Sequence, residues 1–314
     1  MDLFEKKGIK PMLIAEMQDP FDSPEYIYEL KLDGERCIAY LDKTETVLQN
    51  KRSFVMNARF PELNEIHKAA KVRCILDGEL AVISDGKPDF FEVQRRSIMS
   101  NKFKIELASS KHPACFTAFD ILYYKDKQVT DLPLMERKKL LSKALKENEQ
   151  IAVSRFIEEQ GIAFYKLAVQ QQLEGIVAKR KDSRYYMDKR TKDWIKIKYL
   201  KDDDYIVCGY IQKNNNVVSI VLGKYSGNDI IYKGHVTLEV SREDFNVIAR
   251  TQRIDSPSFP TPKGNEDAIW IKPINVCTVK FMMKTGSGGL RQPVFKGLRD
   301  DKATEECKEA SADI

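Results

Sequence analysis

The 314-residue sequence lacks the features that direct a protein into or across a membrane. No apolar run approaches the ~20 residues needed to span a bilayer. The first ten residues, MDLFEKKGIK, lack the basic segment followed by an apolar stretch that marks a signal peptide. The sequence therefore predicts a cytoplasmic protein with no membrane partner.

Paired cysteines are also missing. The six cysteines are scattered singly, and none forms a Cys-x-x-Cys pair. Neither a zinc ribbon nor a disulfide framework is predicted from such spacing. The chain also lacks low-complexity tracts and internal repeats, and its length is sufficient for two domains with separate cores.

The charge balance is only mildly basic. The chain has 52 Lys and Arg against 47 Asp and Glu, which gives a net charge of +5. This balance permits a polyanionic partner without requiring one. Residues 179–201 are more informative, because basic and aromatic side chains interleave there. They form either a solvated face or a groove that binds phosphates.

The first two-thirds of the chain predicts antiparallel strands interrupted by helices. Alternating apolar residues around Asp33-Gly34 predict a hairpin over Tyr26–Leu41, and residues 73–84 predict a second strand-turn-strand unit around Asp77-Gly78. Buried strands are predicted at 116–124 and 174–180. Helices are predicted at 60–71, 88–99, 131–150 and 158–172.

The pattern changes after residue 204. Short strands joined by Asn- and Gly-rich turns follow, as in a small antiparallel barrel. Ser241–Asp244 resembles a capping box opening one helix over 242–252. We predict two domains, 1–200 and 201–314, with a hinge near 199–204.

Lys31, two residues before Asp33-Gly34, raises the question of function. Most lysines at strand ends are simply solvated. Four further segments place Glu79 after a turn, Glu174 and Lys179 on one short strand, Lys196 and Lys198 on one strand face, and Arg291, Arg299 and Lys302 near the C-terminus. Each feature alone is weak, but their order along one chain is distinctive.

In this order the motifs resemble the covalent nucleotidyltransferase superfamily, most closely the ATP-dependent DNA ligases. Lys31-Leu-Asp33-Gly34-Glu-Arg36 looks like the nucleophile motif of this family. Six later stretches of the sequence resemble the motifs that follow it in the family: NKRSFVMNARFPEL, LDGEL, FTAFDIL, EGIVAKR, DWIKIK and LRDDK. The stretch TGSGGLRQPVFKGLRDDK is most similar to bacterial end-joining ligases of the ligase D type. The implied fold is α+β: a nucleotidyltransferase (adenylation) domain of antiparallel sheets with flanking helices, followed by an oligonucleotide/oligosaccharide-binding (OB) barrel.

The sequence departs from the family pattern at three places. NKRSF stands where Ser-Arg-Asn-Gly is frequent, although Arg52 is retained. Asp188 replaces a frequent glycine, and Thr278 replaces a frequent glutamate. None of these changes removes a group that the chemistry needs.

The resemblance implies that Lys31 is the nucleophile and carries AMP through a P–N bond. A free lysine has a pKa of ~10.4, so a nucleophilic amine needs desolvation and nearby cations to become reactive. Arg36, Lys196, Lys198 and a bound Mg²⁺ or Mn²⁺ would supply this charge and stabilise the phosphoryl oxygens.

The other roles are also implied by the resemblance. At the nucleoside, Glu29 would accept from the adenine amino group, Phe119 would stack on the base, and Arg36 and Glu79 would hold the ribose. Arg52 would bind the sugar-phosphate. Lys179, Lys196 and Lys198 would face the phosphates, and Glu174 with Glu79 would ligate the metal ion. Arg299 and Lys302 would orient the pyrophosphate leaving group after domain closure.

Plainer interpretations exist for several of these residues. Phe119 and Trp194 can be packing residues, Asp33 and Asp77 turn formers, and Asp120 a turn cap.

The predicted reaction seals 5′-phosphate/3′-hydroxyl nicks in duplex DNA with ATP, in three steps. RNA-end chemistry is the alternative, as an RNA ligase or a GTP-using capping guanylyltransferase; a non-catalytic nucleic-acid-binding OB module is another. We predict a monomer that works with a Ku-type end-binding protein.

Overall fold

The computed structural model describes residues 2–84, 86–212, 218–238, 242–285 and 288–309. The chain divides into two compact units, Met1–Tyr199 and Leu200–Ile314, called here the N-terminal and C-terminal units. Among the described residues, no helix combines the length and the hydrophobicity that crossing a membrane requires.

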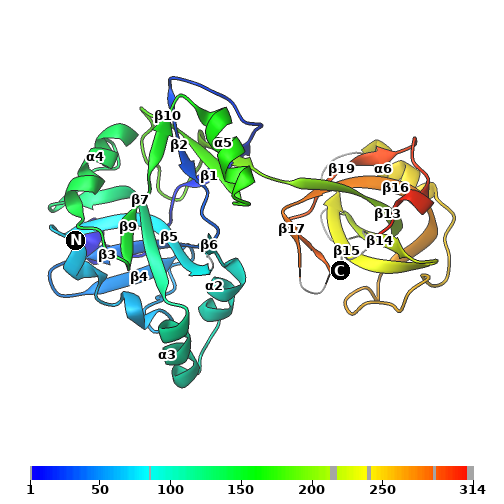
Figure 1. The fold of residues 1–314 in the computed structure, drawn as a ribbon, viewed down its shortest axis with the longest axis horizontal. Coiled ribbons are helices and arrows are strands. Elements are labelled where there is room, and N and C mark those ends of the chain that lie inside the picture. Colours follow the sequence, from blue (N-terminus) through cyan, green and yellow to red (C-terminus); the bar gives the residue numbers. More distant parts are fainter. Residues whose placement is uncertain (1, 85, 213–217, 239–241, 286–287, 310–314) are drawn as a thin grey trace. The chain divides into compact units, whose positions relative to one another are not determined.

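Two sheets form the N-terminal unit (Figure 1). The first sheet has the order β1 (Leu13–Met17), β12 (Arg190–Lys198), β11 (Gly175–Arg180), β2 (Tyr26–Leu30) and β10 (Phe156–Glu158). The second has the order β4 (Thr46–Asn50), β3 (Glu35–Leu41), β5 (Cys74–Ser84), β7 (Ala114–Tyr124) and β8 (Lys127–Gln128), with β6 (Lys87–Pro88) on β5 and β9 (Ile151–Val153) on β7. Pairing is antiparallel except for β1 with β12 and β7 with β9.

Five α-helices accompany these sheets within the described residues: α1 (Leu3–Lys6), α2 (Phe90–Ser97), α3 (Lys102–Lys111), α4 (Leu134–Ala144) and α5 (Gly161–Gln170). The predicted α-helix at 60–71 is wrong. That segment forms two separate 3-10 turns, η1 (Pro61–Leu63) and η2 (Ile66–Ala69). Helix α3 was not predicted from sequence; its Phe103 side chain is 73% exposed, so the helix lacks a continuous apolar stripe.

The two predicted hairpins of the N-terminal unit are also wrong. β2 and β3 belong to different sheets, so Asp33-Gly34 connects one sheet to the other. A Cβ on Gly34 would lie 2.1 Å from the Leu80 carbonyl oxygen, so this close approach requires glycine. Asp77-Gly78 lies inside the single strand β5, where the register with β7 shifts. A Cβ on Gly78 would lie 2.5 Å from the Phe116 ring.

The hydrophobic core is arranged in layers. Ile27 of β2 and Trp194 of β12 pack with Ile38 of β3 in one cluster, so side chains of both sheets meet there. On the outer face of the first sheet, Tyr28 packs beside α5, and on the outer face of the second sheet Leu141 of α4 joins another cluster. The sheet faces that point toward each other therefore line the interior in which a site can form.

The C-terminal unit contains a five-stranded antiparallel sheet in the order β15 (Asp229–Leu238), β14 (Val218–Ser226), β13 (Lys201–Gln212), β16 (Ile269–Phe281) and β19 (Val294–Arg299). The other elements are α6 (Arg242–Arg250), β17 (Met283–Lys284), β18 (Leu290–Arg291) and η3 (Thr304–Glu306). A separate core that includes Ile220 of β14, Val279 of β16 and Ile248 of α6 supports this unit. Ser241, the first residue of the predicted capping box, lies outside the described residues.

Candidate active site

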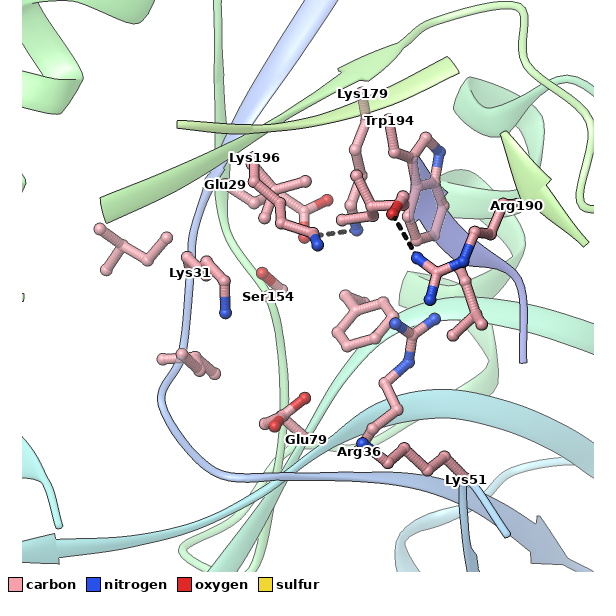
Figure 2. Close-up of a pocket in the computed structure, with 16 residues that line it drawn as sticks. Glu29, Lys31, Arg36, Lys51, Glu79, Ser154, Lys179, Arg190, Trp194 and Lys196 are labelled. Carbon is pink, nitrogen blue, oxygen red and sulfur yellow. Dashed lines mark hydrogen bonds and ion pairs between the residues drawn. The ribbon is translucent and has the colours of Figure 1, made fainter. Parts of the chain in front are cut away.

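A pocket of about 340 Å³ opens between the two sheets of the N-terminal unit (Figure 2). Both sheets contribute to its lining, together with the segments that follow β2 and β4. The lining residues are Leu13, Ile14, Glu29, Leu30, Lys31, Leu32, Arg36, Lys51, Glu79, Phe119, Ser154, Val177, Lys179, Arg190, Trp194 and Lys196. The volume falls in the range of small-molecule sites.

Strand alternation explains why so many charged side chains meet here. In β2, Tyr28 packs in the outer cluster, so the next residue, Glu29, points to the inner face. Lys31 lies two positions later and therefore on the same side as Glu29. In β12, Ile195 and Ile197 take the outer positions, which leaves Lys196 on the inner face. The same alternation in β11 directs Lys179 inward. Period-two patterning therefore concentrates these residues on one wall of the pocket.

Lys31 is held by a buried carboxylate. Its Nζ donates a hydrogen bond to Glu174 Oε2 over 2.7 Å, and its backbone N–H donates to the Gly175 carbonyl over 2.9 Å. Lys198 Nζ lies 3.0 Å from the other oxygen of Glu174. The Glu174 side chain is 1% exposed, whereas that of Lys31 is 22% exposed. One buried carboxylate thus anchors two ammonium groups, and the Lys31 amine stays accessible from the pocket.

Glu29 lies in a second buried cluster, at the Phe119 and Trp194 side of the pocket. Lys179 Nζ donates to Glu29 Oε2 over 3.0 Å and lies 4.3 Å and 4.1 Å from the ring centroids of Phe119 and Trp194. Burial lowers the pKa of Lys179 to about 8, although the neighbouring Glu29 opposes this shift. This lysine is therefore packed between a carboxylate and two aromatic rings.

Asp77 fixes Arg36 over the pocket. Arg36 makes a bidentate contact of 2.7 Å and 2.6 Å with the two Asp77 oxygens, and its guanidinium carbon lies 4.7 Å from the Phe119 ring centroid. The Tyr185 hydroxyl also donates to Asp77. The interpretation of Asp77 as a turn former is wrong, because this residue is fully buried inside β5.

Glu79 and Lys196, which also line the pocket, have shifted pKa values. Burial raises the pKa of Glu79 to about 8, and the nearby Lys31 and Arg36 only partly oppose this. Burial also lowers the pKa of Lys196, and the ammonium groups of Lys198 and Lys31 lower it further. Shifts caused by desolvation and like charges in one pocket are typical of functional sites.

Arg52 lies in the exposed turn after β4. The Asn50 side-chain oxygen accepts from the backbone N–H groups of Arg52 and Phe54 over 3.0 Å and 3.1 Å, and Ser53 has a φ of 63°. Lys51, which the sequence did not suggest, lines the pocket, whereas Arg52 is not among the described lining residues. The family's frequent Asn at the Ser53 position suits the same left-handed backbone.

The other departures from the family pattern have local explanations. Asp188 adopts a φ of 57°, the conformation for which a glycine is suited, so the turn is kept despite the replacement. The Thr278 hydroxyl donates to Asp204 Oδ1 over 2.6 Å in the C-terminal unit. Each substituted residue therefore has a defined place in the structure.

The predicted cations of the C-terminal unit are paired within that unit. Arg299 makes a bidentate contact of 2.7 Å with both oxygens of Asp301, and its Nη1 lies 3.7 Å from Asp204. Lys302 donates to Asp204 Oδ2. Arg299 and Lys302 are 38% and 28% exposed, so both remain partly accessible.

Comparison with known proteins gives the family. Residues 11–198 match the family described as the ATP dependent DNA ligase domain, and residues 213–302 match the ATP dependent DNA ligase C terminal region. The chain belongs to the ATP-dependent DNA ligase family. The prediction of an ATP-using DNA ligase, with an adenylation domain and a C-terminal OB region, is confirmed over the RNA-end and non-catalytic alternatives.

Relatives of this ligase differ in length. The chain is 29% identical over 293 residues to the SPbeta prophage-derived DNA ligase-like protein LigB of Bacillus subtilis, covering 93% of this chain and 99% of that protein. It is 28% identical over 317 residues to the multifunctional non-homologous end joining protein LigD of Pseudomonas aeruginosa, covering 95% of this chain but 36% of that protein. The chain therefore spans about a third of this longer relative.

Solved ligase structures share the fold. The structure of mycobacterial DNA ligase D complexed with ATP and MES aligns with a TM-score of 0.58 at 24% identity, covering 99% of this chain and 100% of that chain. A Lig E DNA ligase described as binding DNA with a minimal scaffold aligns with a TM-score of 0.62 at 17% identity, covering 93% of this chain and 100% of that chain. At these identities the likeness concerns the fold alone.

The sequence identified the pocket wall but not its supports. Seven of the predicted residues line the pocket: Glu29, Lys31, Arg36, Glu79, Phe119, Lys179 and Lys196. Glu174 adjoins the pocket through its contact with Lys31, and Lys198 contacts the other oxygen of Glu174. Sequence reasoning missed Lys51, Arg190 and the pairing of Asp77 with Arg36. The turn-cap interpretation of Asp120 is also wrong, because Asp120 is buried in β7 and paired with Arg137.

Proposed function

We propose that this DNA ligase seals 5′-phosphate/3′-hydroxyl nicks in duplex DNA through a covalent adenylate on Lys31. The amine of Lys31 attacks the α-phosphorus of ATP, a P–N bond forms, the bond to pyrophosphate breaks, and the amine loses a proton. AMP then passes to the DNA 5′-phosphate, and attack by the 3′-hydroxyl releases it. The observation that carries the proposal is Lys31 itself: partly exposed in the pocket, yet anchored at 2.7 Å to a buried carboxylate.

The two ends of the pocket suit different parts of ATP, one the base and the other the phosphates. Phe119 and Glu29 lie with Lys179 and Trp194, a combination of rings and a buried acceptor that suits adenine. Arg36 and Glu79 would hold the ribose, and Arg52 the sugar-phosphate. Lys196 and Lys198 would face the phosphates, where fixed cations stabilise developing charge. The buried position of Lys179 beside Glu29 favours the base end over the phosphate role expected from sequence.

A divalent cation fits this site only with help from ATP. The described residues contain no group of three or more His, Cys, Asp or Glu side chains that could hold a metal ion. Glu79 offers the hard oxygens that Mg²⁺ or Mn²⁺ prefers, but both oxygens of Glu174 already lie beside lysine ammonium groups. We expect the phosphates of ATP to provide further ligands, with Glu79 and Glu174 as the protein contribution. The ion would supply charge neutralisation for the phosphates.

The C-terminal unit would complete the first step. Arg299 and Lys302 are partly exposed cations with short carboxylate contacts, which a triphosphate can replace. We propose that a hinge near residues 199–204 brings them to the pyrophosphate. Domain closure of this kind commonly assembles a catalytic site.

The experiment that tests the proposal is incubation with [α-³²P]ATP, followed by a nicked duplex. Wild type is expected to form an acid-stable adduct that mass spectrometry locates on Lys31, and to seal the nick. Lys31→Ala is expected to lose the adduct while retaining its fold, because Lys198 still pairs with the buried Glu174 carboxylate. Lys43→Ala, which alters an exposed lysine away from the pocket, is the matched control. An adduct on another residue, or labelling by GTP alone, contradicts the proposal.

A role in joining double-strand breaks is a further part of the proposal. It is supported by relatives named for non-homologous end joining, and it implies a Ku-type end-binding partner acting on a monomeric ligase in the cytoplasm. A Ku-type protein should stimulate joining of linear duplexes while nick sealing stays unchanged. Equal effects on both substrates would contradict a specific end-joining partner.

A further inference from the structure

A buried lysine behind the pocket has no part in the functions described so far. Lys138 lies on α4 and is 4% exposed. Its Nζ forms an ion pair with Glu29 Oε1, on the opposite side of the carboxylate group from the Lys179 contact at Oε2. Lys138 is not a lining residue of the pocket, so it acts on the pocket through its contact with Glu29 and through its charge near Lys179.

The cluster carries more positive charge than structural neutralisation requires. One buried carboxylate, Glu29, is shared by two buried ammonium groups, Lys138 and Lys179. Burying an excess charge is costly, and a single lysine would already balance Glu29. The lowered pKa of Lys179 reflects this cost, since burial and the nearby Lys138 both disfavour its charged form. A second lysine needs another explanation.

Each carboxylate oxygen of Glu29 is held by its own lysine. Lys138 contacts Oε1 through both its charge and a hydrogen bond, and Lys179 contacts Oε2. Glu29 also lines the pocket beside Phe119 and Trp194. A carboxylate oxygen can accept more than one hydrogen bond, so Glu29 can bind its lysines and a donor on a stacked base at the same time. The two lysines therefore fix the orientation of a carboxylate that borders the proposed base site.

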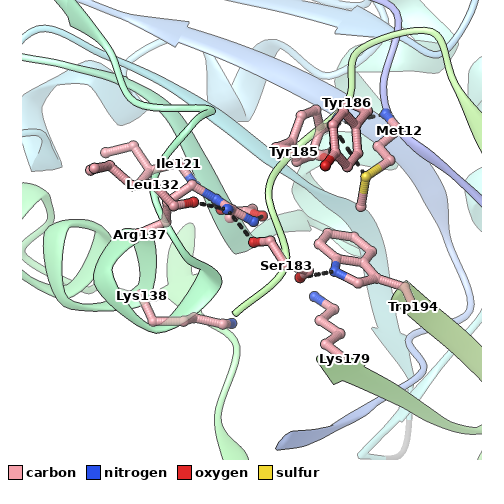
Figure 3. A network of polar contacts seen from close by, with 12 residues as sticks. Met12, Ile121, Leu132, Arg137, Lys138, Lys179, Ser183, Tyr185, Tyr186 and Trp194 are labelled. Atoms are coloured by element: carbon pink, nitrogen blue, oxygen red, sulfur yellow. Dashed lines mark hydrogen bonds and ion pairs between the residues drawn. The ribbon is translucent and has the colours of Figure 1, made fainter. Parts of the chain in front are cut away.

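Helix α4 is anchored so that Lys138 has little freedom. The neighbouring Arg137, fully buried, makes two contacts of 2.8 Å with Asp120, the residue after Phe119. It also donates to the Ser183 carbonyl over 2.8 Å, in the segment after β11 (Figure 3). Figure 3 shows Lys138 and Lys179 extending toward each other from α4 and β11. Two consecutive cations thus attach α4 to the back of the pocket.

We propose that Lys138 is a positioning residue for base selection: by holding Glu29 Oε1 from behind, it keeps the carboxylate ionised and directed at the 6-amino group of adenine. The proposal rests on the role of Glu29 given under the proposed function. Without Lys138, Glu29 would turn toward Lys179 or take up a proton, and the acceptor for the 6-amino group would be lost.

The test compares two nucleotides that differ only in the 6-amino group of the purine. Binding of ATP and of purine riboside 5′-triphosphate, which lacks the 6-amino group, is measured by calorimetry with Lys31→Ala as the background so that no chemistry follows. A hydrogen bond to a charged group predicts an ATP preference of about tenfold to a hundredfold. Adding Lys138→Met is expected to reduce this preference to within about threefold, mainly because ATP binds more weakly.

Control variants separate positioning from general damage. Lys139→Met, at the exposed neighbouring position on α4, should retain the full preference, and Lys138→Arg should restore most of it. If Lys138→Met does not fold, Lys138→Gln gives the same comparison. Parallel weakening of both nucleotides, or an unchanged preference, would overturn the proposal and leave Lys138 a structural residue.

The same measurement distinguishes this inference from the function on which it rests. Glu29→Leu, which has no acceptor, should also remove the preference for ATP. If Glu29→Leu removes it and Lys138→Met does not, only the role of Lys138 is wrong. If Glu29→Leu retains it, Glu29 does not bind the 6-amino group, and its assignment in the proposed function fails.

Discussion

Two lysines with proposed roles in the first step, one in each unit, are both paired with a carboxylate, but in contrasting surroundings. Lys31 contacts Glu174, whose side chain is 1% exposed and also holds Lys198. Lys302 contacts Asp204, which is 11% exposed and also receives a hydrogen bond from Thr278. The two lysines are similarly exposed, at 22% and 28%, so the difference lies in the carboxylate. Removing a fully buried carboxylate leaves its cations uncompensated and is costly, whereas pairs nearer the solvent contribute less. The first pair is thus suited to fixed positioning and the second to exchange.

Removing the acid of the buried pair should have the largest effect. Glu174→Ala leaves two ammonium groups facing each other without a carboxylate, and breaking a buried pair of this kind costs about 3–5 kcal/mol. We expect a large decrease in the free energy of unfolding, measured with urea, and loss of adenylylation. A stable, fully active Glu174→Ala protein would show that the contact does not position Lys31.

Removing the arginine of the C-terminal unit should have a smaller and step-specific effect. Arg299→Ala is expected to slow enzyme adenylylation by about tenfold or more, because a charge-assisted contact to the leaving group is lost. Sealing of a pre-adenylylated nick should be spared. Equal loss of both activities would contradict the role proposed for Arg299.

The pH dependence of stability should reveal the raised pKa of the half-buried Glu79. Because burial raises the folded-state pKa of Glu79 to about 8, the folded protein retains a proton that the unfolded chain releases above its ordinary pKa of 4.5. This contribution to stability is therefore lost as pH rises from about 4.5 to about 8. Glu79→Gln, which stays neutral, should gain stability relative to wild type over that range, measured by urea unfolding without nucleotide or metal. Parallel pH curves would contradict the assignment.

Removing the acid of the partly exposed pair should have the smallest effect. Asp204→Asn releases Lys302 while keeping a polar side chain, and partly exposed pairs contribute about 0.2–1 kcal/mol. We expect the free energy of unfolding to change by no more than this amount. Adenylylation should become up to about fivefold faster, because Lys302 no longer has to leave Asp204. A loss as large as that of Glu174→Ala would remove the contrast between the two pairs.

The reach of the sequence can be seen from particular residues. Helices α2, α4 and α5 were predicted because their apolar spacing or flanking residues are local signals. Glu29 and Lys31 were placed on one face by alternation alone. The hairpins around Asp33-Gly34 and Asp77-Gly78 failed, because a turn signal does not say which sheet each strand joins. Pairing between sheets depends on close backbone approaches such as that of Gly34 to Leu80.

The residues that hold the site side chains in place could not be predicted from the sequence, for a related reason. Asp77 with Arg36 and Lys138 with Glu29 are pairs separated by 41 and 109 positions (77 − 36; 138 − 29), and nothing local marks them as partners. The sequence by itself determined the order of the motifs and which side chains share a strand face, because alternation is a local property of extended backbone. Only the tertiary structure decided which faces meet, and therefore which buried charges find a partner, because packing of distant segments sets those distances.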